Sequence, residues 1–399
     1  MRGRRPLPIL SLALALIVAA ALPAAAQKVP GVTDTGVAIA ALLDLTGPLQ
    51  HPGNEARKAM DIFFADLNEQ GGVQGRKVSV IYEDHATNPP KAVAAAKLVL
   101  SRHDVFAFVN PMASPVMAAL FPLIESEKIP TVSPMAVSSI LYEPPKRYVF
   151  ATITSTYDVS WVVAEYIAND LGAKGGKLGV IHQDDEYGRS GLRGYQEAAP
   201  KLGLSLVSEQ AYKRGSVDFS SQVLNLRRDG VEFVAHVGLG AAHAAILKEA
   251  VKLGWKPRVF GEIGSMTLPT LELAGEAAAL SFWGYDKAVD TDEVPGIQAV
   301  RRIVQRKAPE MTRIDPNFLL AWVGSMVFTE GLKRAGRNLD REGYVAALEG
   351  IRSFDTGGIM APISFGANVR KGGGAVKIYK PDLARKTYVA LTDWRTPKR

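Results

Sequence analysis

The residues with the clearest chemical potential lie in short turns rich in glycine or acid. Gly238-Leu239-Gly240-Ala241-Ala242-His243 follows an apolar segment and begins a helical pattern, which is the context of a dinucleotide-binding turn. His243 stands where that motif needs its third glycine, and no suitable carboxylate follows. We therefore expect no cofactor, but a tight turn whose free N–H groups can face a ligand.

Two further motifs resemble a phosphate-binding loop and a metal site, but neither has the full pattern. Gly172-Ala173-Lys174-Gly175-Gly176-Lys177 has the wrong spacing for a phosphate loop, and Leu178 replaces the hydroxyl residue that would hold magnesium. Asp184-Asp185-Glu186 could bind a metal, although such a run is also typical of a solvated loop. The six histidines lack a metal-ligand spacing, so we expect no metal site.

Sequence signatures of catalysis are missing from the chain. It has no G-x-S-x-G, H-E-x-x-H or G-x-x-x-x-G-K-[ST] motif, and its cysteine count of 0 excludes disulfides, cysteine-ligated metals and thiol nucleophiles. We therefore expect that the protein is not an enzyme. The alternative is an exported hydrolase that would use a cleft serine with His51, or a metal at Asp184-Asp185.

Strand-like and helical segments alternate along most of the 399 residues. In the first series we expect strands at 37–43, 78–82, 105–109 and 129–132, and in the second series strands at 178–182, 205–209, 231–237 and 258–261. Helices are expected between them, among others at 115–124, 159–171, 190–202, 219–228 and 242–253. This alternation predicts an α/β fold with mostly parallel sheets flanked by helices.

The pattern changes after Leu280. Two helices are expected at 296–307 and 317–335, and the aromatic face of the second is typical of core packing. The tail contains strand-like pieces at 375–379 and 387–391, joined at Pro381-Asp382. Because no low-complexity linker separates the halves, we expect two lobes joined by several ordered crossings that act as a hinge.

The N-terminus has the pattern of a cleaved export signal. Arg2, Arg4 and Arg5 precede an apolar stretch from Leu7 to Leu22, and Ala24 and Ala26 form an A-x-A cleavage site. We predict a signal peptide at residues 1–26 and a periplasmic mature protein; an uncleaved anchor is the alternative. The formal net charge is +7, and the basic residues are scattered, so we expect no nucleic-acid partner.

Ligands of open α/β sheets bind at loops that follow the carboxyl ends of the strands. The loops in that position are Asp44–Asn54, Asn110–Ser114, Ser133–Ser139, His182–Gly188, Gly238–Ala242 and Glu262–Met266. Ser114 stands at the start of a helix, where its hydroxyl and the first amides could hold a carboxylate; a simple N-cap is equally consistent with its position.

Several motifs in order resemble the substrate-binding proteins of ABC importers of the leucine/isoleucine/valine-binding type. The resemblance runs from about residue 31 to residue 393. It is carried by Val37-Ala38-Ile39-Ala40 with Leu45-Thr46-Gly47-Pro48, by the stretch Ala65 to Lys77, and by Tyr82-Glu83-Asp84, Asn88-Pro89, Ile129 to Pro134, Asp185-Glu186-Tyr187-Gly188 and Asp218-Phe219-Ser220.

The resemblance implies a two-lobed type I periplasmic-binding-protein fold with three hinge crossings. The N-terminal lobe would comprise 27–151 and 283–358, and the C-terminal lobe 152–282 and 359–399. Such a protein closes around one small molecule and delivers it to the membrane permease of an ABC importer, and we expect it to be a monomer. A sensor that reports ligand occupancy to a separate membrane receptor is a further alternative.

The resemblance also implies a set of ligand-binding positions, which are His51, Ala113, Ser114, Met135, Ala136, Val137, Tyr187, Leu239, Gly240, Glu262 and Ile263. In the amino-acid binders, the positions of Val137 and Ile263 carry a threonine and an acid that hold the ammonium group. Neither Val137 nor Ile263 can pair a buried ammonium, and an unpaired buried charge costs several kcal/mol. We therefore predict a ligand with a carboxylate or polar head and an apolar or aromatic body. Amino acids stay open because Glu262 could rotate inward, and amides and ureas are further alternatives.

Overall fold

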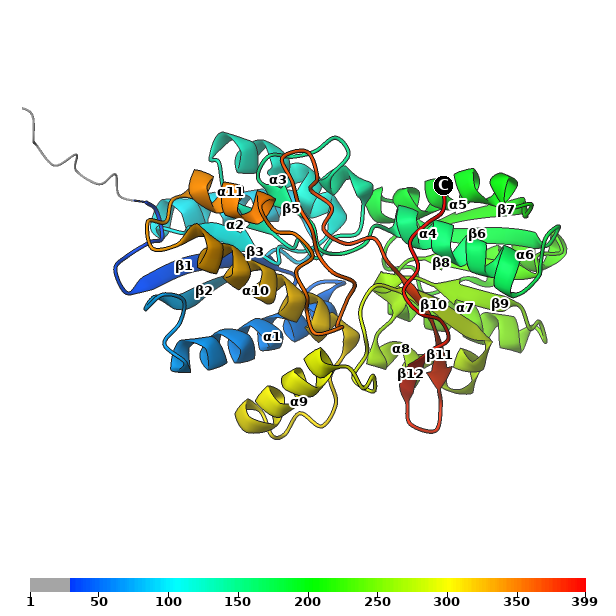
Figure 1. Cartoon of the computed structure of the whole chain (residues 1–399). Helices are drawn as coiled ribbons and strands as arrows, with labels where there is room; N and C mark the ends of the chain where they lie inside the picture. The colour runs from blue at the N-terminus through cyan, green and yellow to red at the C-terminus, as the bar shows by residue number, and fades with distance from the viewer. Residues whose placement is uncertain (1–28) are drawn as a thin grey trace, which may run out of the picture.

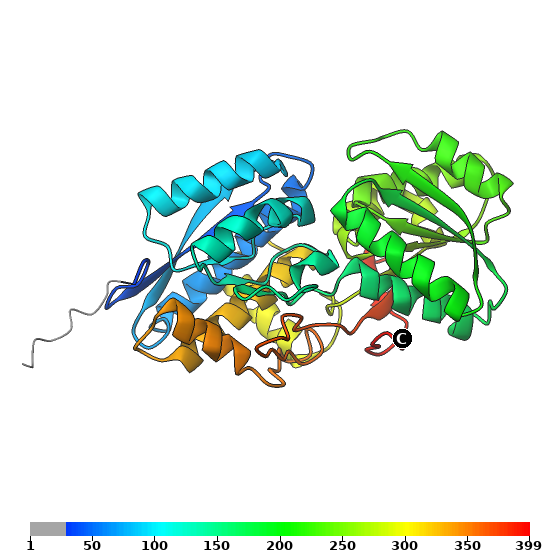
Figure 2. The same cartoon turned by 90° about the horizontal axis from the view of Figure 1, so that it is seen from above.

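Two separate β-sheets, one in each lobe, organise the chain (Figure 1). The structure is a computed structural model, and it describes residues 29–399; the predicted signal peptide at residues 1–26 lies outside the described part. The two lobes lie side by side, and helices cover both faces of each sheet (Figure 2).

The first sheet has five parallel strands in the order β2-β1-β3-β4-β5. The strands are β1 (Gly36–Leu43), β2 (Lys77–Asp84), β3 (Ala107–Val109), β4 (Thr131–Val132) and β5 (Val149–Phe150). The helices of this lobe are α1 (Gln50–Glu69), α2 (Pro89–Arg102), α3 (Ser114–Ser126), α9 (Pro295–Lys307), α10 (Pro316–Ala335) and α11 (Arg341–Glu349). Residues 39–43 of β1 are completely buried, as expected for a strand with neighbours on both sides and helices above and below.

The second sheet has seven strands in the order β12-β11-β10-β9-β8-β6-β7. The strands are β6 (Lys177–Gln183), β7 (Ser205–Tyr212), β8 (Phe233–Val237), β9 (Arg258–Gly261), β10 (Ser281–Tyr285), β11 (Lys377–Asp382) and β12 (Thr387–Ala390). Its helices are α4 (Thr156–Glu165), which continues as a π-turn at Tyr166–Asp170, α5 (Glu186–Lys201), α6 (Ser220–Arg228), α7 (Gly240–Lys252) and α8 (Leu268–Ala274). The strands β6 to β10 are parallel, whereas β11 and β12 form an antiparallel edge.

The predicted fold class is confirmed, but the ends of several elements differ, and the short elements β5, α8 and α11 were not predicted. The prediction missed β10, which continues the parallel series, and it placed the tail turn at Pro381-Asp382, which are the last residues of β11. Since β10 lies wholly in the second sheet, the expected lobe boundary at 282/283 divides a strand. The segment after Ile359 still packs on the first lobe, because Phe365 donates its N–H to Ile351 O, so the third crossing lies beyond the expected boundary at 358/359.

The chain passes between the lobes three times, and hydrogen bonds tie these passages together. The first, after β5, pairs with the third, because Ala151 exchanges backbone hydrogen bonds of 2.8 Å with Arg370 and Gly372. The second, after β10, meets the first where Thr154 N–H donates to Asp286 Oδ2 over 2.6 Å. The lobes are therefore joined by a compact hinge instead of a loose linker.

A row of buried polar side chains crosses the core of the second lobe, next to β8. Tyr212 Oη lies 3.0 Å from His236 Nε2, His236 Nδ1 lies 3.1 Å from His243 Nδ1, and His243 Nε2 lies 2.9 Å from Ser281 Oγ. Each contact needs one donor and one acceptor, and neutral imidazoles satisfy all three in sequence. Burial lowers the pKa of His243 to about 3, and burial together with His243 lowers the pKa of His236 well below its usual value.

Acid should therefore destabilise the second lobe through these histidines. Both have folded pKa values below the unfolded value near 6.5, so the unfolded chain binds more protons and stability falls as the pH drops below about 6.5. Each histidine contributes a slope of up to about 1.4 kcal/mol per pH unit. We expect denaturant titrations between pH 7 and pH 5 to show this loss and His243→Gln to reduce it. The exposed control His103→Gln should keep the wild-type slope; an equal slope in both variants would contradict the assignment.

Candidate ligand-binding site

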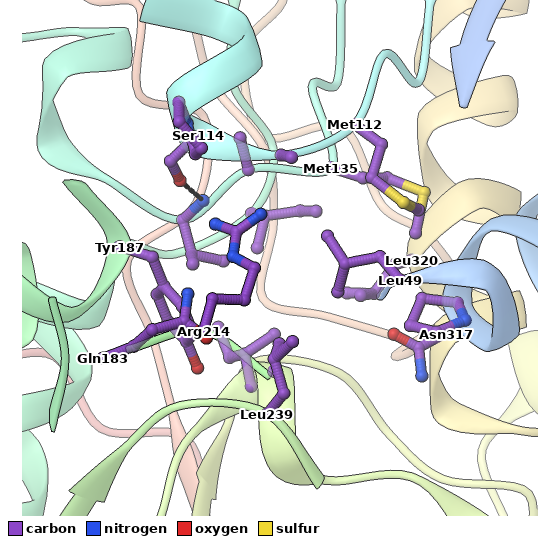
Figure 3. Close-up of a pocket in the computed structure, with 18 residues that line it drawn as sticks. Leu49, Met112, Ser114, Met135, Gln183, Tyr187, Arg214, Leu239, Asn317 and Leu320 are labelled. Atoms are coloured by element: carbon purple, nitrogen blue, oxygen red, sulfur yellow. Dashed lines mark hydrogen bonds between the residues drawn. The ribbon is translucent and has the colours of Figure 1, made fainter. Parts of the chain in front are cut away.

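A cavity lies between the two lobes, with walls from both (Figure 3). Its volume is about 590 Å³, part of which is open to solvent. The first lobe contributes Leu49, Pro52, Met112, Ala113, Ser114, Pro115, Met135, Ala136, Val137, Ile153, Asn317 and Leu320. The second contributes Gln183, Tyr187, Arg214, Leu239, Ile263 and Gly264.

Nearly all of these residues follow the carboxyl ends of parallel strands, as predicted. In the first lobe they follow β1, β3, β4 and β5, and in the second lobe they end or follow β6, β7, β8 and β9. The two sheets point these ends at each other across the cleft, so that one ligand can touch loops from both lobes.

The apolar end of the cavity is built by two loops that pair with each other. Met112 and Met135 form an isolated parallel bridge, with Ala113 N–H donating to Met135 O over 3.1 Å and Met135 N–H donating to Pro111 O over 2.7 Å. This pairing brings the two thioether side chains together, next to Leu49 and Leu320 (Figure 3). Such a surface takes up an apolar group without polar contacts.

Leu49 is held at the cavity by a buried carboxylate below it. Asp44 is completely buried, and its Oδ1 and Oδ2 accept the N–H groups of Gly47 and Leu49 over 2.5 and 2.9 Å. Thr87 Oγ1 also donates to this carboxylate. The turn before α1 is thereby fixed from the interior of the lobe.

The first lobe offers hydrogen-bond donors at the start of α3. The N-cap position is taken by Ala113 at φ 78°, and its methyl side chain cannot cap. The interpretation of Ser114 as an ordinary N-cap is therefore wrong: its Oγ accepts the N–H of Val137 over 3.2 Å and ties two loops together. The hydroxyl proton is still available for a ligand, and the first-turn amides of a helix have no partner within the helix.

Tyr187 forms part of the opposite wall. Its ring is 5 % exposed, and its hydroxyl donates to Gly238 O over 3.0 Å. Gly264 packs directly on this ring, because a Cβ at that position would lie 2.5 Å from Tyr187 Oη. The tyrosine therefore presents a fixed ring to the cavity, with its hydroxyl turned to the backbone of its own lobe.

Arg214 is the cation of the cavity wall. It follows β7 and reaches toward the side of the cavity that carries Tyr187 and Ser114 (Figure 3). Its Nη2 donates to Asp185 Oδ2, and the two side chains are 20 % and 17 % exposed. Gln183 Nε2 donates to the same carboxylate oxygen over 2.5 Å. The polar end of the cavity thus combines a guanidinium, an amide and a hydroxyl.

Eight of the predicted ligand-binding residues line the cavity. These are Ala113, Ser114, Met135, Ala136, Val137, Tyr187, Leu239 and Ile263. Three do not. Gly240 begins α7 and faces Thr270, since a Cβ there would lie 2.0 Å from Thr270 Oγ1.

His51 and Glu262 are held by other partners. His51 Nε2 lies 3.0 Å from Asp315 Oδ2; burial lowers the pKa of His51, but the hydrogen bond and charge of Asp315 outweigh it and raise that pKa overall. Glu262 is completely buried, and its Oε1 accepts the hydroxyl of Ser160 over 2.8 Å. Burial raises the pKa of Glu262 well above its usual value, and the carboxyl group lies against α4, away from the cavity.

Ten lining residues were not among the predicted ligand-binding positions, and Arg214 is the most consequential of them. The expected strand at 205–209 continues to Tyr212, so the loop that carries Arg214 was not recognised as a strand-end loop. Asn317 and Leu320 begin α10, whose apolar pattern indicated only core packing. If the strand had been predicted to end at Tyr212, the basic residue shortly after it would have indicated Arg214 as a site residue. The other seven are Leu49, Pro52, Met112, Pro115, Ile153, Gln183 and Gly264.

Within residues 29–399, no group of three or more histidine or acidic side chains is arranged to hold a metal ion. In the acidic run, Asp185 caps α5 and Asp184 pairs with Arg189 over 3.1 Å. The helices in this part of the chain also include none that is long and apolar enough to span a membrane.

The chain belongs to the periplasmic binding protein family, which matches residues 36–385. A Leu/Ile/Val-binding protein homolog from Brucella suis is 25% identical over 354 residues, covering 86% of each chain. The Leu/Ile/Val-binding protein of Escherichia coli is 23% identical over 329 residues, covering 82% of this chain and 86% of its own.

Solved structures give the same class. A fatty acid ABC transporter substrate-binding protein from Thermomonospora curvata has a TM-score of 0.83 at 26% identity, covering 93% of this chain and 95% of that one. A branched-chain amino acid ABC transporter protein from Thermus thermophilus with bound valine has a TM-score of 0.82 at 24% identity, covering 90% and 97%. The chain is thus a periplasmic binding protein, and its relatives are named as binding proteins of transporters and not as enzymes, in agreement with the prediction that it is not an enzyme.

The position of Glu262 leads to a prediction about stability. Its folded pKa lies above the unfolded value near 4.5, so the folded protein binds one more proton and the group lowers stability as the pH rises above 4.5. The glutamine of Glu262→Gln does not titrate. In denaturant titrations, the unfolding free energy of the variant relative to that of the wild type should therefore increase from pH 5.5 to pH 8. The exposed control Glu276→Gln should follow the wild type. A difference that stays constant with pH would show that Glu262 is ionised in the folded protein.

Proposed function

We propose that this protein is the extracytoplasmic solute receptor of an ABC importer and that its ligand is a small organic acid with an apolar or aromatic body. It captures the ligand between the lobes and delivers it unchanged to the membrane permease. Residues 1–26 direct export to the periplasm and are removed after Ala26.

The observation that carries the proposal is the distribution of polarity in the cavity. Its 18 lining residues include a single charged side chain, Arg214, and no carboxylate. Without an acidic partner, burial of a ligand ammonium is strongly unfavourable. A ligand carboxylate has donors on both walls, from Arg214 in the second lobe and from Ser114 in the first.

The apolar end supports the second half of the proposal. A ligand body can pack against Leu49, Met112, Met135 and Leu320 while its head reaches Arg214. The relative from Thermomonospora curvata is described as a fatty acid transporter component, and fatty acids combine a carboxylate with an apolar chain. Branched-chain amino acids are the alternative, since the relative from Thermus thermophilus holds valine.

Ligand capture and closure are coupled in this proposal. Since the donors of the polar end come from different lobes, a carboxylate that contacts both binds the closed form better than the open form and shifts the population toward it. Changing the ratio of closed to open form from 1:99 to 99:1 requires that the ligand bind the closed form more tightly by about 5.5 kcal/mol. A few charge-assisted hydrogen bonds and one buried apolar group are of that size.

A thermal-shift screen of the purified mature protein tests the ligand class. The panel contains octanoate and phenylacetate, their primary amides, and leucine, valine and phenylalanine. We expect the acids to stabilise the protein by about 2.7 kcal/mol at 100 times their dissociation constant. Stabilisation by the free amino acids alone would show that the cavity accepts an ammonium and would replace the proposed ligand class.

Arg214→Gln should weaken the binding of the acid by at least tenfold in calorimetric titrations, because a charge-assisted hydrogen bond is lost, and should leave the binding of the amide within about twofold. Arg189→Gln is the matched control, since Arg189 pairs with Asp184 at the surface and does not line the cavity. Equal losses in the two variants would mean that general charge, and not contact with Arg214, attracts the acid.

The wall tyrosine provides an independent test. Tyr187→Phe keeps the ring and removes only the hydroxyl that donates to Gly238 O, so affinity should change by less than about threefold. Tyr187→Ala removes the wall and should weaken binding at least tenfold. If the alanine variant binds as well as the wild type, Tyr187 is not part of the site.

A further inference from the structure

We propose that Asp185 is a resident counter-ion of Arg214, which an incoming ligand carboxylate displaces, so that this residue sets the affinity of the protein for acids. The inference rests on the proposed function. Asp185 would be a positioning residue: it does not line the cavity, but it holds the guanidinium that does.

Asp185 is well partnered even without the arginine. Its Oδ1 accepts the N–H groups of Tyr187 and Gly188 over 3.0 and 3.2 Å, which caps the start of α5. Its Oδ2 accepts Gln183 Nε2 over 2.5 Å. The carboxylate is therefore fixed by three donors of its own lobe, and it stays satisfied when Arg214 leaves.

Arg214 is the movable member of the pair. Within residues 29–399, Asp185 is the side chain that accepts a hydrogen bond from its guanidinium, through Nη2. A guanidinium has five N–H donors, and arginine reaches its position through a long flexible stem. Its loop follows β7 and includes Gly215 at φ 84°, a backbone conformation that glycine adopts without strain. The guanidinium can therefore turn from Asp185 to a ligand while Asp185 stays in place.

The ion pair explains how a mostly apolar wall can include the charged side chain of Arg214 before a ligand binds. The positive charge of Arg214 is neutralised by Asp185 before the ligand binds, so no uncompensated charge is kept between the lobes. An incoming carboxylate replaces one anionic partner by another and also reaches Ser114 across the cleft. Asp185 thus competes with the ligand for the same donors, and a neutral amide is a weaker competitor than an acid.

Removal of this competition should strengthen the binding of acids. In Asp185→Asn the side-chain oxygen still caps α5, because asparagine is as good an N-cap as aspartate, but the negative charge is lost. We expect calorimetric titrations with octanoate and phenylacetate to give dissociation constants about tenfold lower than in the wild type. The corresponding primary amides should bind within about twofold of their wild-type affinity. A purely structural role of Asp185 predicts weaker binding of both.

Two further variants keep the outcome interpretable. Asp340→Asn is the matched control, because Asp340 caps α11 through Gly343 N–H on the outer side of the first lobe, and it should bind acids as the wild type does. Asp185→Ser also retains an N-cap and removes the charge, and it replaces Asp185→Asn if thermal unfolding shows that the latter does not fold.

The outcomes separate this inference from the proposed function. If the wild type binds the acids and both Asp185 variants bind them equally well or more weakly, the counter-ion role is wrong and the ligand class stands. If neither the wild type nor the Asp185 variants bind any acid of the panel, the proposed ligand class falls, and the counter-ion role with it.

Discussion

Burying an unpaired charge between two protein lobes is strongly unfavourable, and this constraint governs the site. The wall includes one cation and no anion, and the cation is neutralised at its base by Asp185. The acid that could have received a ligand ammonium, Glu262, is completely buried and hydrogen-bonded to Ser160 in the core of its own lobe. The charge of the cavity wall thus depends both on the absence of a carboxylate from the lining and on the position of Asp185 behind Arg214.

The architecture was largely predictable from sequence because it depends on the period of apolar residues. The buried run in β1 and the alternation of strands and helices indicated parallel sheets, and parallel sheets place their strand-end loops at one edge. Eight lining residues follow from that rule and the family resemblance together. Strand ends were less predictable, since β7 continues three residues further than its apolar pattern, and Arg214 was missed for this reason.

The orientation of side chains could not be predicted at all. Ile263 and Glu262 are neighbours at the end of β9, yet one faces the cavity and the other the helix α4. A short 3-10 turn at Ile263–Ser265 decides between them, and it is stabilised by the reciprocal bonds of Glu262 and Ser265. Likewise, Asn317 and Leu320 reach the cavity only because α10 packs on α1, a contact between segments far apart in the chain.

The paired loops that carry Met112 and Met135 have a consequence for the breadth of recognition. Both thioethers are unbranched and flexible, so they can rearrange around differently shaped groups at low cost. Tyr187, in contrast, is held by Gly264, which packs on its ring, and by the hydrogen bond from its hydroxyl to Gly238 O. One end of the cavity is therefore rigid and the other compliant. For ligands of the proposed class, this arrangement favours strict selection of the head group and tolerance of differently shaped apolar bodies.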